Sequence, residues 1–214
     1  MKLLHAICAT LIAVTAVAQS VPESLKTFAE GDLVFVAPAT ENAITTVTRG
    51  SDSIAVDHVG ILHRIGGKEG LPYVIEAISR GVCLTPLDSF LVHNEECRLI
   101  IARATGLNIE QSISNALHYV GKPYDFIYET TDSAIYCSEL VQFSFVGTDG
   151  KAIFHQTAMS FHDNSGKILP YWIEHYAQRG LTVPDGEPGT NPTQLLRSPS
   201  VKVTGSFNLA RQRW

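Results

Sequence analysis

Several short motifs that mark common enzyme classes are missing from this sequence of 214 residues. It has neither the G-x-x-x-x-G-K-[ST] loop nor the G-x-G-x-x-G turn with which proteins cradle nucleotide phosphates. The C-x-x-C, H-x-x-x-H and H-E-x-x-H spacings of common zinc sites are also missing, as is the G-x-S-x-G elbow of serine hydrolases. We therefore expect no nucleotide, no metal and no other cofactor, and no nucleophile of the elbow-serine type.

Positive charge and long apolar runs are scarce as well. The chain has 16 lysines and arginines against 21 acidic residues, for a net charge of −5, and no basic run. This balance disfavours nucleic acid as a main partner. Beyond the first 18 residues, no stretch approaches the roughly 20 apolar residues that a membrane-spanning helix needs. We expect neither a nucleic-acid partner nor a transmembrane segment in the mature chain.

Residues 1–18 have the pattern of a secretory signal peptide. Lys2 stands near the front, an apolar run follows, and Ala16 and Ala18 form an A-x-A cleavage site. The sequence therefore predicts an exported protein, periplasmic or secreted. What remains, residues 19–214, is predicted to be a single domain, because a chain of this length buries about 70% of its extended surface.

Three cysteines remain once the signal peptide is removed: Cys83, Cys97 and Cys137. In an oxidising compartment an odd number allows at most one bridge, and a bridge between Cys83 and Cys97 would leave Cys137 free. The alternative, in which all three thiols are reduced, is equally open.

Cys137 stands where a buried helix is predicted to begin. Leu140, Val141 and Phe145 follow at helical spacing, and the pattern ends at Gly147. Unpaired N–H groups and the positive end of the helix dipole favour a thiolate at such a position, and the thiolate is the nucleophilic form of cysteine. Free cysteines are also among the most buried residue types, so a small core residue is the other interpretation.

Two strands are predicted over residues 57–65 and 71–78, joined by a glycine-rich turn that suits an antiparallel hairpin. Glu76 interrupts the apolar run of the second strand. A buried carboxylate needs a partner, and the neighbouring strand offers His58. Exposure of Glu76 on an edge strand is the alternative. Gly60, on the same face as His58, leaves room for another group to approach.

Three of these residues could supply the nucleophile, the base and the orienting group of a cysteine-based catalytic mechanism. The thiol needs a base within hydrogen-bond reach, and the base is best held in one tautomer by a third group. Cys137, His58 and Glu76 would fill those roles in that order. An ordinary strand histidine remains the alternative for His58. The other histidines of the predicted mature chain, at positions 63, 93, 118, 155, 162 and 175, are expected at the surface or in packing.

Other elements are predicted from periodicity and punctuation. The sequence predicts strands over residues 31–36 and 97–103, a short helix within 40–53, a helix from Asn108 to Gly121 with Gln111 as capping partner, a helix over 169–179 and an irregular segment over 183–200. This last segment is assigned to the domain because Leu195, Leu196, Val201 and Val203 need burial.

Five stretches in order resemble a known family: Gly31–Phe35 (GDLVF), Asp57–Ile61 (DHVGI), Val74–Ala77 (VIEA), Gly121–Asp125 (GKPYD) and Tyr136–Val141 (YCSELV). They are similar to the YiiX-like permuted papain-like enzymes, a circularly permuted branch of the NlpC-type cell-wall amidases that is also related to the lecithin:retinol acyltransferases. The resemblance extends over most of the mature chain.

The resemblance implies an α+β, circularly permuted papain-like (NlpC-type) fold, in which an antiparallel sheet packs against a helix with the catalytic cysteine at its N-terminus. Carried over by position, Cys137 matches the nucleophile, His58 the base and Glu76 the polar third member. Tyr124 would lie on the substrate side of the cleft, and Asp125 beside it is predicted to bind substrate as well.

The function predicted from these observations is an exported cysteine hydrolase that cleaves an amide bond through a thioacyl-enzyme. The resemblance suggests peptidoglycan stem peptides as its substrate, so the expected partner is a peptide or a peptidoglycan fragment. Two alternatives remain open: a thiol acyltransferase or esterase that acts on lipid or ester substrates, and a cleft that binds peptides without turnover.

Overall fold

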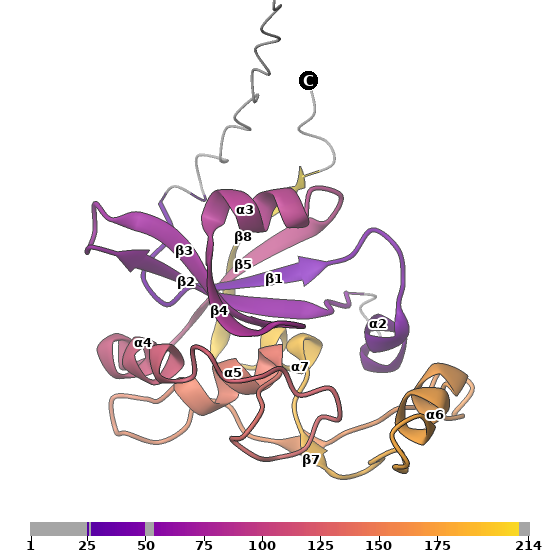
Figure 1. The fold of residues 1–214 in the computed structure, drawn as a ribbon. Coiled ribbons are helices and arrows are strands. Elements are labelled where there is room, and N and C mark those ends of the chain that lie inside the picture. Colours follow the sequence, from indigo (N-terminus) through magenta and orange to yellow (C-terminus); the bar gives the residue numbers. More distant parts are fainter. Residues whose placement is uncertain (1–24, 26, 50–53, 210–214) are drawn as a thin grey trace, which may run out of the picture.

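A computed structural model of the chain describes residues 25, 27–49 and 54–209, and at its centre is one antiparallel sheet of six strands (Figure 1). The strands are β1 (Leu33–Ala37), β2 (His58–Ile65), β3 (Leu71–Ile78), β4 (Gly81–Pro86), β5 (Arg98–Ala104) and β8 (Val201–Asn208). They lie in the order β4-β3-β2-β1-β5-β8. The mixed fold with an antiparallel sheet that the sequence predicts is confirmed.

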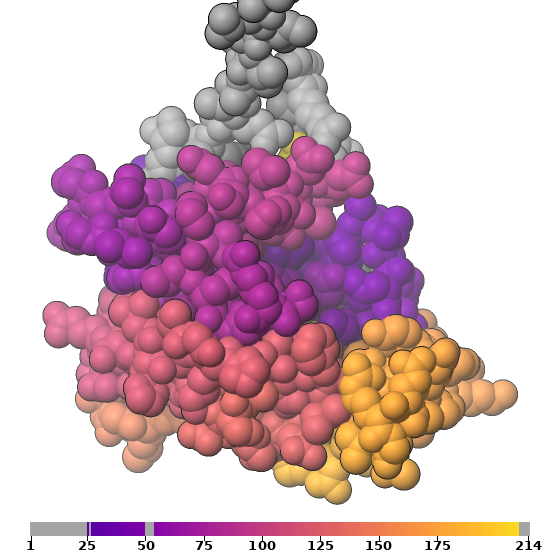
Figure 2. All heavy atoms as spheres, viewed as in Figure 1, coloured from indigo at the N-terminus to yellow at the C-terminus, as the bar shows by residue number. Residues whose placement is uncertain are grey.

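Helices lie on both sides of this sheet. α3 (Leu87–His93) lies on one side, and α4 (Ile109–His118), α5 (Cys137–Ser144) and α7 (Pro192–Leu196) lie on the other (Figure 1). α2 (Ala43–Thr48) follows β1, and the short strands β6 (Thr157–Ala158) and β7 (Pro188–Gly189) pair with each other. The segment around α6 (Pro170–Ala177) forms a lobe at one side of the molecule (Figure 2).

Alternation of side chains along the strands divides the core around the sheet into two clusters, one on each face. Leu33 and Phe35 of β1 pack in the cluster that includes α5, whereas Val34 and Val36 pack in the cluster that includes α3. All four side chains are buried. The sheet therefore has no solvated face at its centre, and β1 reads as a continuous apolar run for this reason.

Immediately before β1, Asp32 ties the chain to Arg103 of β5. The Asp32 side chain is 1% exposed and accepts hydrogen bonds from Arg103 Nε at 2.6 Å and Nη2 at 2.8 Å. The Ala29 backbone N–H donates a third bond to it at 2.8 Å. A buried carboxylate with three donors is well satisfied, so the Gly-Asp pair of the first motif has a structural explanation.

The strands predicted over residues 31–36, 57–65, 71–78 and 97–103 are confirmed as β1, β2, β3 and β5. Asn108 caps α4, because its Oδ1 accepts from the Gln111 backbone N–H at 3.2 Å. The second half of the predicted capping box is wrong: the Gln111 side chain donates to Asn115 instead. α4 ends at His118 and continues as a turn to Gly121.

Sequence periodicity missed β4, α3, α7 and β8. The expectation that Val203 needs burial is wrong, since its side chain is 58% exposed. β8 is the outermost strand beside β5, and one of its faces is open to solvent. The predicted irregular segment over 183–200 contains the short elements β7 and α7.

The thiols of Cys83, Cys97 and Cys137 are free. Cys83 is in β4, whereas Cys97 immediately precedes β5, and three strands lie between those two. Four strand spacings amount to about 19 Å, far beyond the reach of a disulfide. The bridge between Cys83 and Cys97 is therefore wrong.

The predicted signal peptide lies outside the described residues. In the ranges that are described, no helix is long and apolar enough to cross a membrane.

Candidate active site

Cys137 is the first residue of α5, as the sequence predicts. Tyr136 precedes it as the N-cap in an extended conformation and makes no side-chain capping bond, so the first N–H groups of the helix stay available near the thiol. Cys137 is only 5% exposed and belongs to the core cluster around α5. Burial and the helix-start position, which the sequence left as alternatives, thus occur together.

His58 begins β2 and forms an ion pair with Glu76 of β3. The distance from His58 Nε2 to Glu76 Oε2 is 2.7 Å. Glu76 is 4% exposed, so the alternative of a solvent-exposed edge residue is wrong. A Cβ placed on Gly60 would lie 2.3 Å from Val74 Cγ1, so the close approach expected at this glycine is made by Val74.

The electrostatics of this pair favour a charged imidazole. Burial alone would lower the pKa of His58, but hydrogen bonds with Cys137 and Glu76 outweigh it and raise the pKa to about 10. Burial also works against ionisation of Glu76, yet the hydrogen bond with His58 and a further one with Thr85 bring the pKa of this carboxyl below its usual value. His58 therefore contacts both the thiol and the carboxylate, and it holds positive charge between them.

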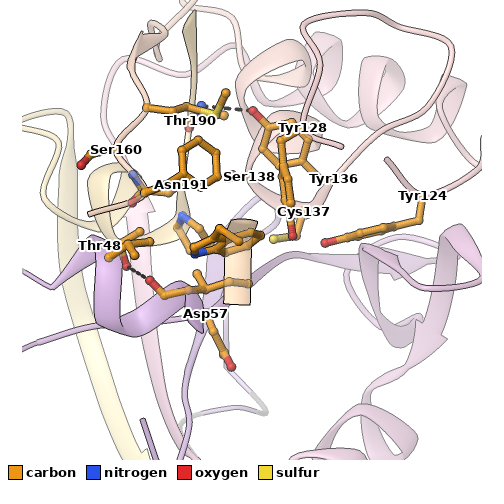
Figure 3. A pocket seen from close by; sticks show the side chains of 16 residues that line it. Thr48, Asp57, Tyr124, Tyr128, Tyr136, Cys137, Ser138, Ser160, Thr190 and Asn191 are labelled. Atoms are coloured by element: carbon orange, nitrogen blue, oxygen red, sulfur yellow. Dashed lines mark hydrogen bonds between the residues drawn. The ribbon is translucent and has the colours of Figure 1, made fainter. Parts of the chain in front are cut away.

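A pocket opens beside Cys137, between α2, the loop before α5 and the segment that carries β6 and β7 (Figure 3). Apolar and aromatic side chains make up most of its wall: Ile44, Val47, Tyr124, Tyr128, Tyr136, Met159, Phe161, Trp172 and Pro192. None of its lining residues is a lysine or arginine, and Asp57 is its one carboxylate. The wall suits an uncharged group.

Tyr124 lies where the sequence places it, on the pocket wall, and its hydroxyl points toward the Cys137 sulfur (Figure 3). Tyr128 and Thr190 also line this pocket but were not anticipated. In the sequence, Tyr128 is only a tyrosine four residues after Tyr124 in a predicted loop. Loops have no repeating pattern of side-chain directions, so the sequence does not predict that Tyr128 lies near Cys137.

Comparison with known proteins places this geometry in a family. The sequence model of the permuted papain-like amidase enzymes, the YaeF/YiiX, C92 family, matches residues 27–204. The chain belongs to this family. It is 30% identical over 177 residues to "Uncharacterized protein YiiX" of Escherichia coli (strain K12), a match over 77% of this chain and 84% of that protein.

A solved structure supports the same assignment. The "metalloprotein yiiX" of Escherichia coli O157:H7 matches with a TM-score of 0.65 and 25% identity, over 83% of this chain and 97% of that chain. The resemblance to YiiX-like permuted papain-like enzymes that the sequence motifs indicate is confirmed, and with it a hydrolase kind of function.

That YiiX structure is described as a metalloprotein, which raises the question of metal ligands in this C92 family member. Among the residues that the structure describes, no three of histidine, cysteine, aspartate and glutamate converge on one point. A site of fewer side chains does not match the usual donor sets for tightly held ions. The residues that the structure describes therefore do not fit a metal ion.

Asp125 is 4% exposed and is not among the residues that line the pocket. Its Oδ1 accepts from the Ile127 backbone N–H at 2.8 Å, which closes a local turn. Burial raises the pKa of this carboxyl, although backbone N–H groups oppose the rise. The structure thus gives Asp125 a role in the loop, and its contact with substrate stays a prediction.

Glu139 is a second buried carboxyl in this region, two residues after Cys137. It is fully buried, and neither of its oxygens has a hydrogen-bond partner among the described residues. Burial and the nearby charge of Asp125 raise the pKa of Glu139 to about 9, so its side chain is neutral at pH 7. The sequence does show an acidic residue inside the apolar run of α5.

Proposed function

We propose that the chain is a cysteine amidase in which Cys137 attacks the substrate, His58 transfers the proton and Glu76 holds the imidazole. One observation carries this proposal: His58 Nε2 lies 2.7 Å from the carboxylate of Glu76, and the nearby Cys137 thiol helps to raise the pKa of the same imidazole. A nucleophile near a base that a third group holds in place is the arrangement that covalent catalysis needs. Membership of the amidase family supports the reaction class.

The reaction follows from these contacts. The Cys137 thiolate forms a bond to the amide carbon, and the carbonyl π electrons move to oxygen. The protonated His58 then donates its proton to the departing amine as the C–N bond breaks, which leaves a thioacyl-enzyme and a neutral imidazole. Water loses a proton to His58 and attacks the thioester, the C–S bond breaks and Cys137 leaves as a thiolate, which restores the thiolate and the protonated His58. The Cys137 backbone N–H, at the start of α5, would stabilise the oxyanion.

Stem peptides of peptidoglycan are one candidate substrate, which the sequence resemblance suggests. The acyl part of such a peptide carries carboxylates, and carboxylates are usually bound by arginine or lysine. Among the residues that line the pocket, no such cation occurs, and Asp57 would repel an anionic group. A stem peptide therefore needs cations outside this pocket for its recognition.

A second candidate is an amide or ester with an uncharged, apolar acyl group, and the pocket wall favours it. Phe161, Trp172 and Met159 are packed together with Ile44 and Val47 of α2 in one apolar cluster next to the thiol. An acyl chain that enters this wall removes apolar surface from water without leaving a buried charge unpaired.

Mass spectrometry of the intact protein tests the proposal. The purified protein is mixed with hexanoyl p-nitroanilide or with a γ-D-glutamyl stem peptide, and the mass of an acyl group on Cys137 is sought. Adduct formation is expected in the wild type and in Cys83→Ala, which removes another free thiol, but not in Cys137→Ala. No adduct, no turnover and no fast alkylation of Cys137 would contradict the amidase proposal and favour a non-catalytic cleft.

We also propose that the protein is exported to the periplasm or secreted. The support is the A-x-A arrangement of Ala16 and Ala18 after an apolar run. Cleavage at that site makes Gln19 the first residue of the mature protein. Intact mass of the protein recovered from the producing cell measures this directly, and retention of residues 1–18 would contradict it.

A further inference from the structure

Tyr128 has an unusual backbone. Among the described residues it is the one non-glycine residue with a positive φ, at 56°. The left-handed region is disfavoured for residues with a Cβ, and such conformations persist where the surroundings impose them, often at functional sites. Tyr128 lies in the loop between α4 and α5 and lines the pocket beside Cys137.

The loop is held at both the N–H and the carbonyl of Ile127, the residue before Tyr128. The Ile127 N–H donates to Asp125 Oδ1 at 2.8 Å, and the Ile127 carbonyl accepts from the Tyr176 hydroxyl at 2.9 Å. Asp125 and Tyr176 are both buried. These bonds fix the backbone that the left-handed residue requires, so the direction of the Tyr128 side chain is determined by the fold.

The ring of Tyr128 packs edge-on against Tyr136, with centroids 5.1 Å apart, and against Trp172 at 5.7 Å. From there its hydroxyl converges with that of Tyr124 on the Cys137 sulfur (Figure 3). The two phenols interact with each other, and the neighbouring Cys137 helps to raise the pKa of both. The loop thus delivers a hydroxyl to the reacting atom.

Both phenols stay protonated in the working range of the protein. Burial is the main cause that raises the pKa of Tyr124 and of Tyr128, and the neighbouring Cys137 adds to it. Each phenol carries one O–H donor, so even where one phenol donates to the other, one O–H is left to donate to a third group. The pair therefore offers a proton donor next to the sulfur.

We propose that Tyr128 is a catalytic residue whose hydroxyl, paired with that of Tyr124, donates a hydrogen bond to the oxyanion formed when Cys137 attacks the amide carbon. This inference rests on the proposed amidase function. Tyr128 keeps its proton throughout: the carbonyl oxygen gains the electron pair as the S–C bond forms, and it returns that pair when the amine leaves with the proton of His58. The phenol supplies a preorganised dipole where charge develops.

The other role open to a phenol at this position is to stabilise the resting thiolate. The two roles differ in what they change. A donor to the oxyanion acts in acylation, where the carbonyl oxygen becomes charged, but not in alkylation by iodoacetamide, which has no oxyanion. A donor to the resting thiolate alters the pH dependence of both reactions.

The test compares Tyr128→Phe with the wild type in the full-length mature protein. This substitution keeps the ring contacts and removes only the hydroxyl. Acylation is followed by release of p-nitroaniline from hexanoyl p-nitroanilide and by the mass of hexanoyl-Cys137, and thiolate formation by the iodoacetamide labelling rate against pH. Acylation is expected to fall on the order of 10²-fold, as for loss of one oxyanion donor, with an unchanged labelling profile. Tyr171→Phe, at an exposed tyrosine, is the control and is expected to match the wild type.

Each remaining outcome counts against the proposal. Equal acylation in Tyr128→Phe and wild type would remove the hydroxyl from the mechanism. A shifted labelling profile with a matching loss of acylation would assign it to the resting thiolate instead. A wild type that is never acylated would refute the amidase function itself, and with it this role of Tyr128. That outcome is distinguishable from the others because the wild type, and not only the variant, then fails to react. Near-UV circular dichroism checks that the aromatic cluster of the variant is intact.

Discussion

Two histidine–glutamate pairs share strand β2, and they differ in what surrounds them. His58 pairs with Glu76 at the start of the strand, and His63 pairs with Glu30 near its end. Both imidazoles are largely buried, with 19% and 14% of their side chains exposed. A paired, buried histidine is therefore not by itself a sign of catalysis.

The partners separate the two sites. The Glu76 side chain is 5% exposed, whereas that of Glu30 is 34% exposed. His58 also interacts with Cys137. At the other pair, the second oxygen of Glu30 accepts from the Arg64 backbone N–H. The described residues that line the groove around His63 include no cysteine. The same kind of histidine–glutamate contact thus lies near the thiol at one end of β2 and fastens the chain before β1 to the sheet at the other.

The largest contrast is expected when each histidine is removed. His58→Ala takes away the base and is expected to lower turnover of an amide substrate on the order of 10³-fold, within the range of general acid–base catalysis. His63→Ala removes an equally buried imidazole away from the thiol and should leave turnover unchanged. Steady-state rates of the two folded variants measure this contrast, and equal losses would end the distinction between the pairs.

The two carboxylates give the next contrast. Glu76→Ala is expected to lower kcat/KM on the order of 10²-fold, and Glu76→Gln should fall between that variant and the wild type, because it keeps a hydrogen bond but loses the charge. Glu30→Gln is the matched control at the other pair. Folded Glu76→Ala that works as fast as the wild type would transfer the third role to another residue.

Stability should depend on pH through His58. Its folded pKa is raised from 6.5 to about 10, so the stability from its charged form is complete below pH 6.5 and is lost as the pH rises through about 10. Between these limits the free energy of unfolding of the wild type and of His63→Ala should fall by roughly 1 to 3 kcal/mol. That of His58→Ala should not show this fall. Urea unfolding at pH 6.5 and 10 measures the difference, and identical pH slopes in all three proteins would contradict it.

A buried carboxyl without a partner extends the comparison to a third case. The pKa of Glu139 is raised to about 9 by burial and Asp125, so ionisation in the unfolded chain lowers the wild-type stability as the pH rises from 4.5 to 9. Glu139→Gln removes this dependence. Its free energy of unfolding, measured relative to that of the wild type, should therefore increase on the order of 1 kcal/mol from pH 5 to pH 8. Denaturant midpoints at those two pH values are the measurement. A constant difference would mean that Glu139 is already ionised in the fold.

Sequence reasoning reached the parts of the site that lie on regular elements. Alternation along β2 and β3 and a carboxylate inside an apolar run were enough to bring His58 and Glu76 together. The helical spacing after Cys137 placed it at the first turn of α5. These signals are local, because each follows from the period of one element or from the antiparallel turn between two neighbours.

The parts that sequence reasoning missed depend on distant contacts. Tyr128 lies in an irregular loop, and its own left-handed backbone directs its side chain toward the thiol. The loop is held by a hydrogen bond from Tyr176 to Ile127, two residues that are 49 positions apart in the sequence. β8 is an exposed edge strand whose apolar positions give little pattern. Loops and edge strands take their structure from what they pack against, so no periodicity announces them.

The central claim is that His58, and not His63, stabilises the thiolate form of Cys137. The direct measurement is the rate of Cys137 alkylation by iodoacetamide near pH 7 in the wild type, His58→Ala and His63→Ala. The wild type and His63→Ala should be labelled faster than a free thiol, because the His58 imidazolium stabilises the thiolate, and His58→Ala should be labelled more slowly. Equal rates in His58→Ala and the wild type would contradict the account.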